Sequence, residues 1–305
     1  MPIQDFHAPD FSLRQLQYAV AVAETGSFIA AASLCGVSQP SLSTQVAKLE
    51  GVLDVQLFVR GSKGVSLSPA GEQLLPLFKS ALKAGSEVEA AAATLQDPNA
   101  IPLRIAVIPT VAPYLVPAFT RAMMGEAGPR IHWLELQTAV AEASILSGQA
   151  DAILIADPPS DAGLMDHLIG WEPFMVVMSG SDSAPDQVST AWLHDKPLLL
   201  LDDGHCLREQ TLSLCSLPGG LQSPFRATSL GTMVQMVAAG FGLSVIPAMA
   251  VSVETSRAHL LVRPFEDGKV GRLLRLAYSP SHPLAPQLAV AGDRMAALMR
   301  ENAQP

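Results

Sequence analysis

One twelve-residue stretch, GHCLREQTLSLC at 204–215, combines the residue types that thiol redox chemistry needs. Cys206 directly follows His205, Arg208 stands two residues later, and a second cysteine, Cys215, closes the stretch. A thiol attacks only as its thiolate, and a nearby cation lowers the thiol pKa. Arg208 is always charged and His205 can be protonated. We therefore expect these two side chains to lower the pKa of Cys206 and to make it a nucleophile.

The same cysteines fit other roles less well. The chain has three cysteines and no CxxC pair, and one His beside one Cys supplies half of a zinc site. We therefore expect no metal and no cofactor. A structural disulfide scaffold is not expected either, and any disulfide would be transient and functional. The remaining alternative is that both cysteines are small buried apolar residues, the common fate of free cysteine.

The composition is that of a globular chain with two or three domains. Apolar residues make up 49% and charged residues 15% of the 305 positions. The N-terminus lacks the basic start and apolar core of a signal peptide. The apolar stretch 101–119 contains Arg104 and four prolines, so it is not a membrane span. We expect a cytoplasmic protein with no membrane partner. The net charge of −9 says nothing in favour of nucleic-acid binding.

The first seventy residues have the pattern of a winged helix-turn-helix. Apolar residues recur at helical spacing over 13–23. Ser27 is a candidate N-cap of a second helix, and Ser38 of a third with Pro40 in its first turn. Alternating residues over 55–67 predict a short hairpin, or wing. Two short helices joined by a small turn with glycine predict a helix-turn-helix whose second helix enters the DNA major groove.

Beyond this region the pattern predicts a linker helix and two α/β lobes. Residues 69–95 read as one long helix, in which Pro76 predicts a kink. Short apolar strands then alternate with helices, which favours a parallel sheet covered on both faces. We place the DNA-binding domain at 1–68, the linker helix at 69–99 and the regulatory domain at 100–305. Its first lobe covers about 100–170 and 271–305, and its second about 171–270.

Residues 11–75 resemble the winged helix-turn-helix of LysR-type transcriptional regulators, through the motifs SQPSLSTQVAKLE, LF-x-R and LSPAG. The resemblance implies an α+β multidomain protein: an N-terminal winged helix-turn-helix, a linker helix that pairs subunits, and a two-lobed α/β periplasmic-binding-protein-like regulatory domain. It implies double-stranded DNA and RNA polymerase as partners. It places the DNA contacts on eight residues: Ser38, Gln39, Pro40, Ser41, Ser43, Lys48, Arg60 and Lys63.

The charge balance of this region is unusual for a DNA-binding domain. Residues 1–66 carry four basic and five acidic side chains. Because phosphate neutralisation supplies most DNA affinity, we expect each unit to bind weakly and several units to act together. The resemblance to LysR-type regulators implies that these units form a homotetramer. The alternative is a helix-turn-helix used only for packing.

The cysteine motif, together with PFRATSL, VAAGFGLSVIPA and IPTVAPYLVP, resembles the peroxide-sensing members of this family. By that resemblance Cys206 is the residue that reacts with hydrogen peroxide and Cys215 is its resolving partner. The resemblance places five further residues around the thiol: Thr110, Thr138, His205, Arg208 and Glu209. Glu209 stands where the family usually has Asp. Thr110 and Thr138 each follow a strand, and each could equally be the N-cap of a following helix.

The resemblance implies a DNA-binding regulator, not an enzyme, that senses peroxide through a reversible Cys206–Cys215 disulfide. One alternative is a LysR-type regulator that responds to a small-molecule effector, with the cysteines incidental; it predicts a ligand-sized crevice. The other is a thiol peroxidase or solute-binding protein that carries the helix-turn-helix by ancestry.

The spacing of the two cysteines constrains any disulfide between them. Residues 209–215 read as a helix, and extending it back to Cys206 separates the cysteines by about 13 Å along the axis and places them on opposite faces. A disulfide needs its Cα atoms about 4.4–6.8 Å apart. We therefore expect that on oxidation either the helix unwinds or the chain around Cys206 moves by several ångströms, with the Gly- and Pro-containing loop 216–224 taking up the slack.

Overall fold

The computed structural model describes residues 8–61, 64–97, 101–123, 130–215, 222–256 and 258–302. The chain forms two compact units, Met1–Ala92 with Leu146–Gly148, and Ala93–Ile145 with Gln149–Pro305. Within the described ranges, no helix is both long and apolar enough to cross a membrane.

The first unit contains the predicted winged helix-turn-helix. Helices α1 (Leu13–Thr25), α2 (Phe28–Leu34) and α3 (Gln39–Leu53) are followed by the antiparallel hairpin β1 (Phe58–Gly61) and β2 (Gly64–Leu67). Both predicted N-caps are confirmed, because Ser27 accepts a hydrogen bond from Ala30 N and Ser38 from Ser41 N. Glu50 of α3 accepts bonds from Leu57 N at 2.7 Å and Phe58 N at 3.3 Å, which fastens the start of the hairpin to α3.

The predicted linker helix is confirmed as α4 (Pro69–Gln96), and Pro76 lies inside it. A proline there removes one helical hydrogen bond. The Ser80 hydroxyl donates to the Pro76 carbonyl at 3.0 Å. Two large apolar side chains of α4, Leu77 and Val88, are 62% and 70% exposed. The helix thus presents apolar surface that a second subunit could cover.

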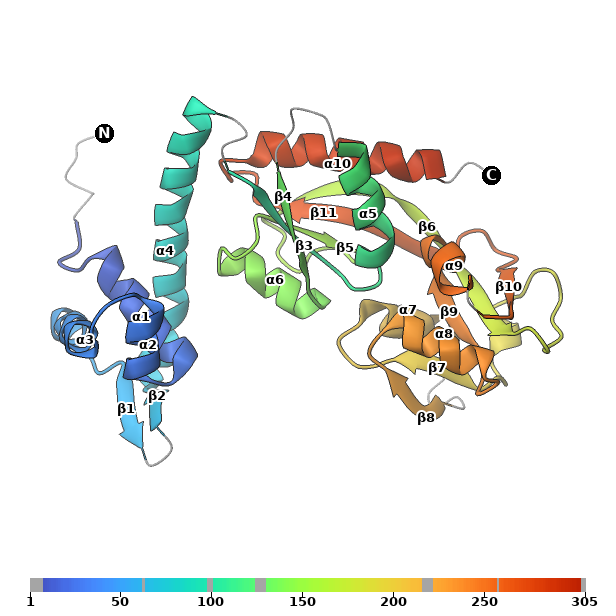
Figure 1. The fold of residues 1–305 in the computed structure, drawn as a ribbon, viewed down its shortest axis with the longest axis horizontal. Helices are drawn as coiled ribbons and strands as arrows, with labels where there is room; N and C mark the ends of the chain where they lie inside the picture. The colour runs from blue at the N-terminus through green and yellow to red at the C-terminus, as the bar shows by residue number, and fades with distance from the viewer. Residues whose placement is uncertain are drawn as a thin grey trace. The chain divides into compact units, whose positions relative to one another are not determined.

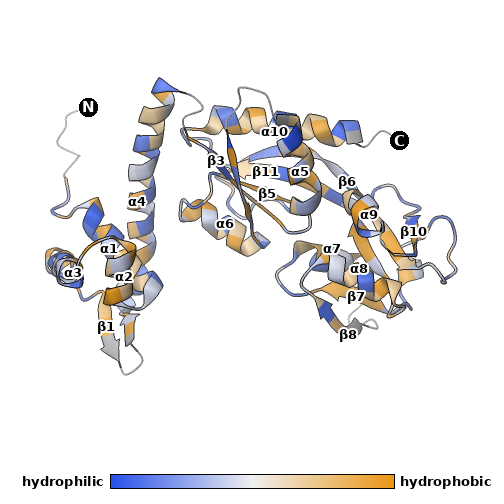
Figure 2. Ribbon diagram, in the orientation of Figure 1, coloured by the Kyte–Doolittle hydropathy of each residue, from blue (hydrophilic) through white to orange (hydrophobic). Residues whose placement is uncertain are grey.

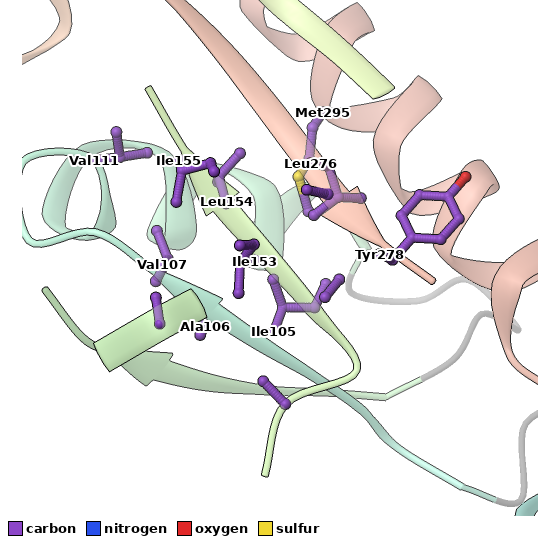
Figure 3. Close-up of a cluster of buried hydrophobic side chains, with 14 of the residues drawn as sticks. Ile105, Ala106, Val107, Val111, Ile153, Leu154, Ile155, Leu276, Tyr278 and Met295 are labelled. Atoms are coloured by element: carbon purple, nitrogen blue, oxygen red, sulfur yellow. The ribbon is translucent and has the colours of Figure 1, made fainter. Parts of the chain in front are cut away.

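The first lobe of the second unit is built on a parallel core. Strands β3 (Leu103–Val107), β4 (Ile131–Glu135) and β5 (Ala152–Ile155) are parallel. In the chain, α5 (Ala112–Met123) connects β3 to β4, and α6 (Thr138–Leu146) connects β4 to β5. β5 is hydrophobic along its length (Figure 2), as expected for a strand covered on both faces. Helix α10 (Ala285–Asn302) returns to this lobe, and its Met295 lies beside Leu276 in the buried cluster (Figure 3).

The expectation of a purely parallel sheet is wrong, because two long antiparallel strands join the lobes. β6 (Met165–Ser179) pairs with β11 (Gly271–Tyr278) along its first half, and β11 pairs with β5. The second half of β6 pairs with β9 (Ser244–Pro247) and β10 (Leu260–Pro264). Figure 1 shows β6 continuing from one lobe into the other. β10 and the short α9 (Ala248–Glu254) were not predicted.

The second lobe carries the cysteine helix. β7 (Leu198–Leu201) pairs in parallel with β8 (Gln222–Ala227), and α7 (Cys206–Cys215) and α8 (Leu230–Ala238) pack beside them (Figure 1). The prediction that the cysteines stand at the two ends of one helix is confirmed. Of Cys215 only the backbone is described, and residues 216–221 of the predicted slack loop lie outside the described ranges.

Candidate functional site

Cys206 lies at the boundary of the two lobes. It is the first residue of α7, and its side chain packs against the hydrophobic cluster of the first lobe. The next residue, Leu207, is 1% exposed and belongs to the cluster of the second lobe. Gly204 just before them has φ +91°, and a Cβ there would lie 2.7 Å from Gln137 Oε1. A glycine is therefore needed for this loop to approach the β4–α6 connection so closely.

The reactive thiol is not activated in the way the sequence predicted. Burial raises the pKa of Cys206, which outweighs the lowering effect of the Arg272 guanidinium. Asp157 raises the pKa further, and the nearby Thr138 hydroxyl lowers it. Thr138 Oγ1 lies near the sulfur, but it has no hydrogen-bond partner among the described residues. In this conformation Cys206 is therefore a free, protonated thiol.

Arg208 makes structural contacts at the start of α7, and the cation with the largest effect on the Cys206 pKa is Arg272. Its Nη1 donates to the Leu201 carbonyl at 3.2 Å, and its Nε lies 3.0 Å from Asp203 Oδ1 and 3.9 Å from Glu209 Oε1. These contacts hold the start of α7 against the end of β7. The Glu209 side chain is 77% exposed. The guanidinium is committed to the β7–α7 turn, and activation of Cys206 by Arg208 stays a prediction.

His205 does not supply a cation either. Burial lowers its pKa, against the opposing effects of Asp202 and Glu135, so the ring is neutral. Its Nε2 lies 3.4 Å from Gln137 Nε2, and its buried Nδ1 has no partner among the described residues. When the Gln137 amide donates, the His205 proton is on Nδ1. Thr138 Oγ1 and His205 Nδ1 are thus two buried polar atoms free to bind a small polar molecule.

The cation that acts on the thiol is Arg272 of β11, which the sequence analysis did not identify. Its Nη1 donates to Thr110 Oγ1 at 2.8 Å, its Nη2 to the Thr110 carbonyl at 3.0 Å, and its Nε to Glu172 Oε2 at 2.8 Å. Both charged side chains are almost fully buried. No local motif marks them; only the pairing of β11 with β6 brings Arg272 opposite Glu172.

The cavity at the cleft side of this site is small. It measures about 130 Å³ and is lined by Thr110, His205, Leu201, Ser229 and Glu254 among others. Sites for drug-sized ligands usually occupy roughly 300–1,000 Å³. This space suits a molecule of a few atoms better than a metabolite.

The predicted DNA-contacting residues gather on one helix of the first unit. Ser38, Gln39, Pro40, Ser41 and Lys48 are exposed at or on α3, and Ser43 is half-buried. Gln39 Nε2 donates to Ser43 Oγ at 2.8 Å, which fixes the amide and leaves its oxygen free to accept. Only the backbone of Arg60 is described, and Lys63 lies outside the described residues.

Comparison with known proteins identifies the family. Residues 13–72 match the bacterial regulatory helix-turn-helix of the lysR family, and residues 96–300 match the LysR substrate binding domain. The chain belongs to the LysR family. It is therefore a DNA-binding transcriptional regulator and not an enzyme, with an N-terminal helix-turn-helix and a two-lobed α/β regulatory domain.

Its relatives within the family carry names that concern peroxide. The chain is 39% identical to a probable hydrogen peroxide-inducible genes activator of Streptomyces viridosporus, over 95% of this chain and 94% of that protein. It is 34% identical to the DNA-binding transcriptional dual regulator OxyR of Escherichia coli, over 90% and 91%.

Solved structures of OxyR proteins are also similar to this chain. A full-length OxyR variant from Pseudomonas aeruginosa is 31% identical with a TM-score of 0.75, covering 95% of each chain. An H2O2-bound OxyR variant from Corynebacterium glutamicum is 32% identical with a TM-score of 0.62, covering 97% of this chain and 96% of that one.

We predict that Arg272 sets the thiol reactivity of Cys206. The Glu172→Gln/Arg272→Met variant removes the cation without leaving a buried unpaired carboxylate. Loss of the guanidinium should raise the Cys206 pKa further, so alkylation by iodoacetamide at pH 7–8 should be roughly threefold to tenfold slower. In the wild type the rate should climb with pH through pH 9, because the thiol pKa lies above its ordinary value.

Peptide-resolved mass spectrometry can follow each cysteine separately. Cys35, in the first unit, serves as the internal control and should react equally in both proteins. The single variant Glu172→Gln keeps the guanidinium and should lie close to the wild type. An unchanged Cys206 rate in the double variant would show that Arg272 does not act on the thiol.

Proposed function

We propose that this chain is a hydrogen-peroxide-responsive transcriptional regulator switched by a reversible disulfide between Cys206 and Cys215. The observation that carries the proposal is the placement of α7. Cys206 packs against the first lobe while Leu207 is buried in the second, so a covalent change at this helix must alter the packing of both lobes. The peroxide-related names of the relatives and the H2O2-bound neighbour support the same reading.

The proposed chemistry uses two thiols and one peroxide molecule. The Cys206 thiol first loses its proton, and the resulting thiolate attacks one peroxide oxygen. The O–O bond breaks, the sulfur becomes a sulfenic acid, and the leaving hydroxide takes up a proton to give water. The Cys215 thiol then attacks that sulfur, water leaves, and the S–S bond forms. In the proposed site Thr138 Oγ1 and His205 Nδ1, which have no partner among the described residues, bind the peroxide, and Thr110, bonded to Arg272, adds a further polar group. A thiol reductant reverses the disulfide.

Disulfide formation requires α7 to unwind. Nine helical steps separate the cysteines by about 13 Å and turn them to opposite faces, whereas a disulfide allows about 4.4–6.8 Å between Cα atoms. Unwinding removes Leu207 from its core, at a cost of about 1.5–3 kcal/mol. It also frees Arg208 from the Leu201 carbonyl. The new covalent bond would hold this repacked state until reduction.

The DNA-binding and assembly roles complete the proposal. α3 enters the major groove through Ser38, Gln39, Pro40, Ser41, Ser43 and Lys48, with Arg60 and Lys63 near flanking phosphates. Because the unit carries few basic residues, we propose a homotetramer that binds through several units at once and contacts RNA polymerase in the cytoplasm. The domains keep the limits 1–68, 69–99 and 100–305. A metabolite held at the thiol site is less well supported, since the cavity beside Thr110 and His205 is only about 130 Å³.

A thiol-trapping assay tests the sensing role. After a short exposure to low peroxide, wild-type protein should lose one pair of alkylatable thiols, and the lost pair should map to Cys206 and Cys215. Cys206→Ser should remove this response, whereas Cys215→Ser should accumulate a longer-lived sulfenic acid. Cys35→Ser is the matched control and should behave as the wild type. Peroxide consumption over many cycles, or equal oxidation of Cys35, would contradict the proposal.

DNA binding by α3 has its own test. Gln39→Ala removes the amide whose oxygen is free to accept from a base edge, so it should change sequence preference by about 1–3 kcal/mol at one position. Lys48→Ala should weaken binding on all sequences alike and reduce the salt slope by about one. Titrations on operator and unrelated DNA at several salt concentrations separate the two effects. Unaltered affinity and preference in Gln39→Ala would exclude α3 as the reading helix.

A further inference from the structure

The cavity beside Thr110 and His205 carries negative charge that the sensing chemistry does not use. Glu135 is the last residue of β4 in the first lobe, Glu254 is the last residue of α9 in the second lobe, and both line the cavity. Among the described residues that line it, none is a lysine or an arginine. Because carboxylates are ionised at neutral pH, the walls supply two negative charges and no positive one.

A hydrogen bond between the lobes fixes the position of Glu254. The Tyr114 hydroxyl of α5 donates to Glu254 Oε1 at 2.6 Å. Burial, and after it the bond to Glu254, raise the pKa of Tyr114, so the phenol keeps the proton that it donates. The other carboxylate oxygen, Oε2, lies beside Gly231, where a Cβ would be 3.2 Å from it. Gly231 also lines the cavity, so the carboxylate is held at the cavity wall.

The charge of Glu135 is felt at the thiol site. Burial lowers the pKa of His205, and the negative charges of Asp202 and then Glu135 oppose that effect. His205 directly precedes Cys206 and is 6% exposed, and its buried Nδ1 has no partner within the described part of the chain. The same cavity is therefore lined by two carboxylates and by a buried ring with a nitrogen free to bind a small molecule.

The guanidinium of Arg272 does not cancel these two charges. Its side chain is 1% exposed, and its Nε bonds to Glu172 Oε2 at 2.8 Å, so this cation is already paired with an anion. Its remaining recorded bonds go to Thr110. An anion that enters the cavity from solvent therefore approaches two carboxylates, and like charges a few ångströms apart repel strongly enough to change a rate severalfold. An uncharged molecule meets no such barrier.

We propose that Glu135 and Glu254 make this cavity a charge filter, an access route to Cys206 that admits small uncharged molecules and slows anions. Hydrogen peroxide is uncharged and passes the filter. Peroxymonosulfate has the same O–O bond but carries a negative charge, so it is held back. The filter would thus restrict the oxidants that reach the thiol. This role in oxidant choice deepens the proposed peroxide sensing and rests on it, whereas the filter itself does not.

Two alkylating reagents that differ in charge test the filter on the reduced full-length protein. Iodoacetamide is uncharged and iodoacetate is an anion, and the thiolate displaces iodide from both. The measurement is the ratio of the iodoacetate rate to the iodoacetamide rate at Cys206, because a change in thiol pKa affects both rates equally. Glu135→Gln/Glu254→Gln should raise this ratio about threefold to tenfold. Added salt should raise the ratio in the wild type and change it less in the variant.

The controls separate the local charge from other effects. Glutamine keeps the length of the side chain and an oxygen that accepts from Tyr114. Glu266→Gln removes a charge from an exposed residue that does not line the cavity, and should leave the ratio as in the wild type. Glu135→Gln alone alters only an exposed side chain, so it guards against misfolding and should raise the ratio by a smaller factor. Cys35 is the internal control, with one ratio in all variants.

An unchanged ratio at Cys206 in Glu135→Gln and in the double variant, or an equal rise in Glu266→Gln, would overturn the filter. Alkylation uses no peroxide, so failure of the peroxide response would count against the proposed function and leave this test intact.

Oxidant choice is read from the oxidation of Cys206 by the two peroxides. Thiolate attack on the terminal oxygen of peroxymonosulfate gives the sulfenic acid and releases sulfate, whereas hydrogen peroxide gives the same product and water. In the double variant the peroxymonosulfate rate should rise about threefold to tenfold relative to the hydrogen peroxide rate. An unaltered ratio of the two oxidation rates would overturn the role of the filter in oxidant choice.

Discussion

The buried ion pair between Arg272 and Glu172 is the interaction on which the site depends. The two residues stand on the two strands that join the lobes, close to the point where β6 changes partners from β11 to β9. A buried pair of this kind costs several kcal/mol of desolvation for each ion, and is stable only if its remaining hydrogen bonds are satisfied. Thr110 and the Met249 amide satisfy them. The Arg272–Glu172 pair thus fixes the crossover, the part of β6 that passes from one lobe to the other. It also orients Thr110 and supplies the positive charge near Cys206.

Helix α7 is held less firmly than the strands that carry the Arg272–Glu172 pair. It is ten residues long, shorter than an isolated helix needs for stability in water, so its helicity relies on packing. That packing is divided, with Cys206 against one lobe and Leu207 inside the other. A short helix held by two partners is well suited to be the element that a covalent bond displaces. The rigid crossover then determines how that displacement reaches the rest of the regulatory domain.

Contacts between residues close together in the sequence made much of this architecture predictable. Ser27 and Ser38 cap helices through contacts three residues away, so the helix-turn-helix could be predicted from spacing alone. The position of the cysteines at the two ends of one helix was predictable for the same reason. Long-range pairing was not predictable: the role of Arg272 depends on Glu172, one hundred residues away in the chain. Sequence proximity pointed to Arg208 as the cation for the thiol, but it could not show that this guanidinium binds Leu201 and Asp203.

In the proposed switch, oxidation replaces the α7 helix with a repacked, cross-linked segment. Hydrogen exchange measured on fully reduced and fully oxidised full-length protein tests it most directly. We expect the amides of 207–215 to be protected in the reduced protein and to lose most of that protection on oxidation, while β6 and β11 stay protected in both. Oxidised protein with an intact Cys206–Cys215 bond and unaltered exchange across α7 would contradict it.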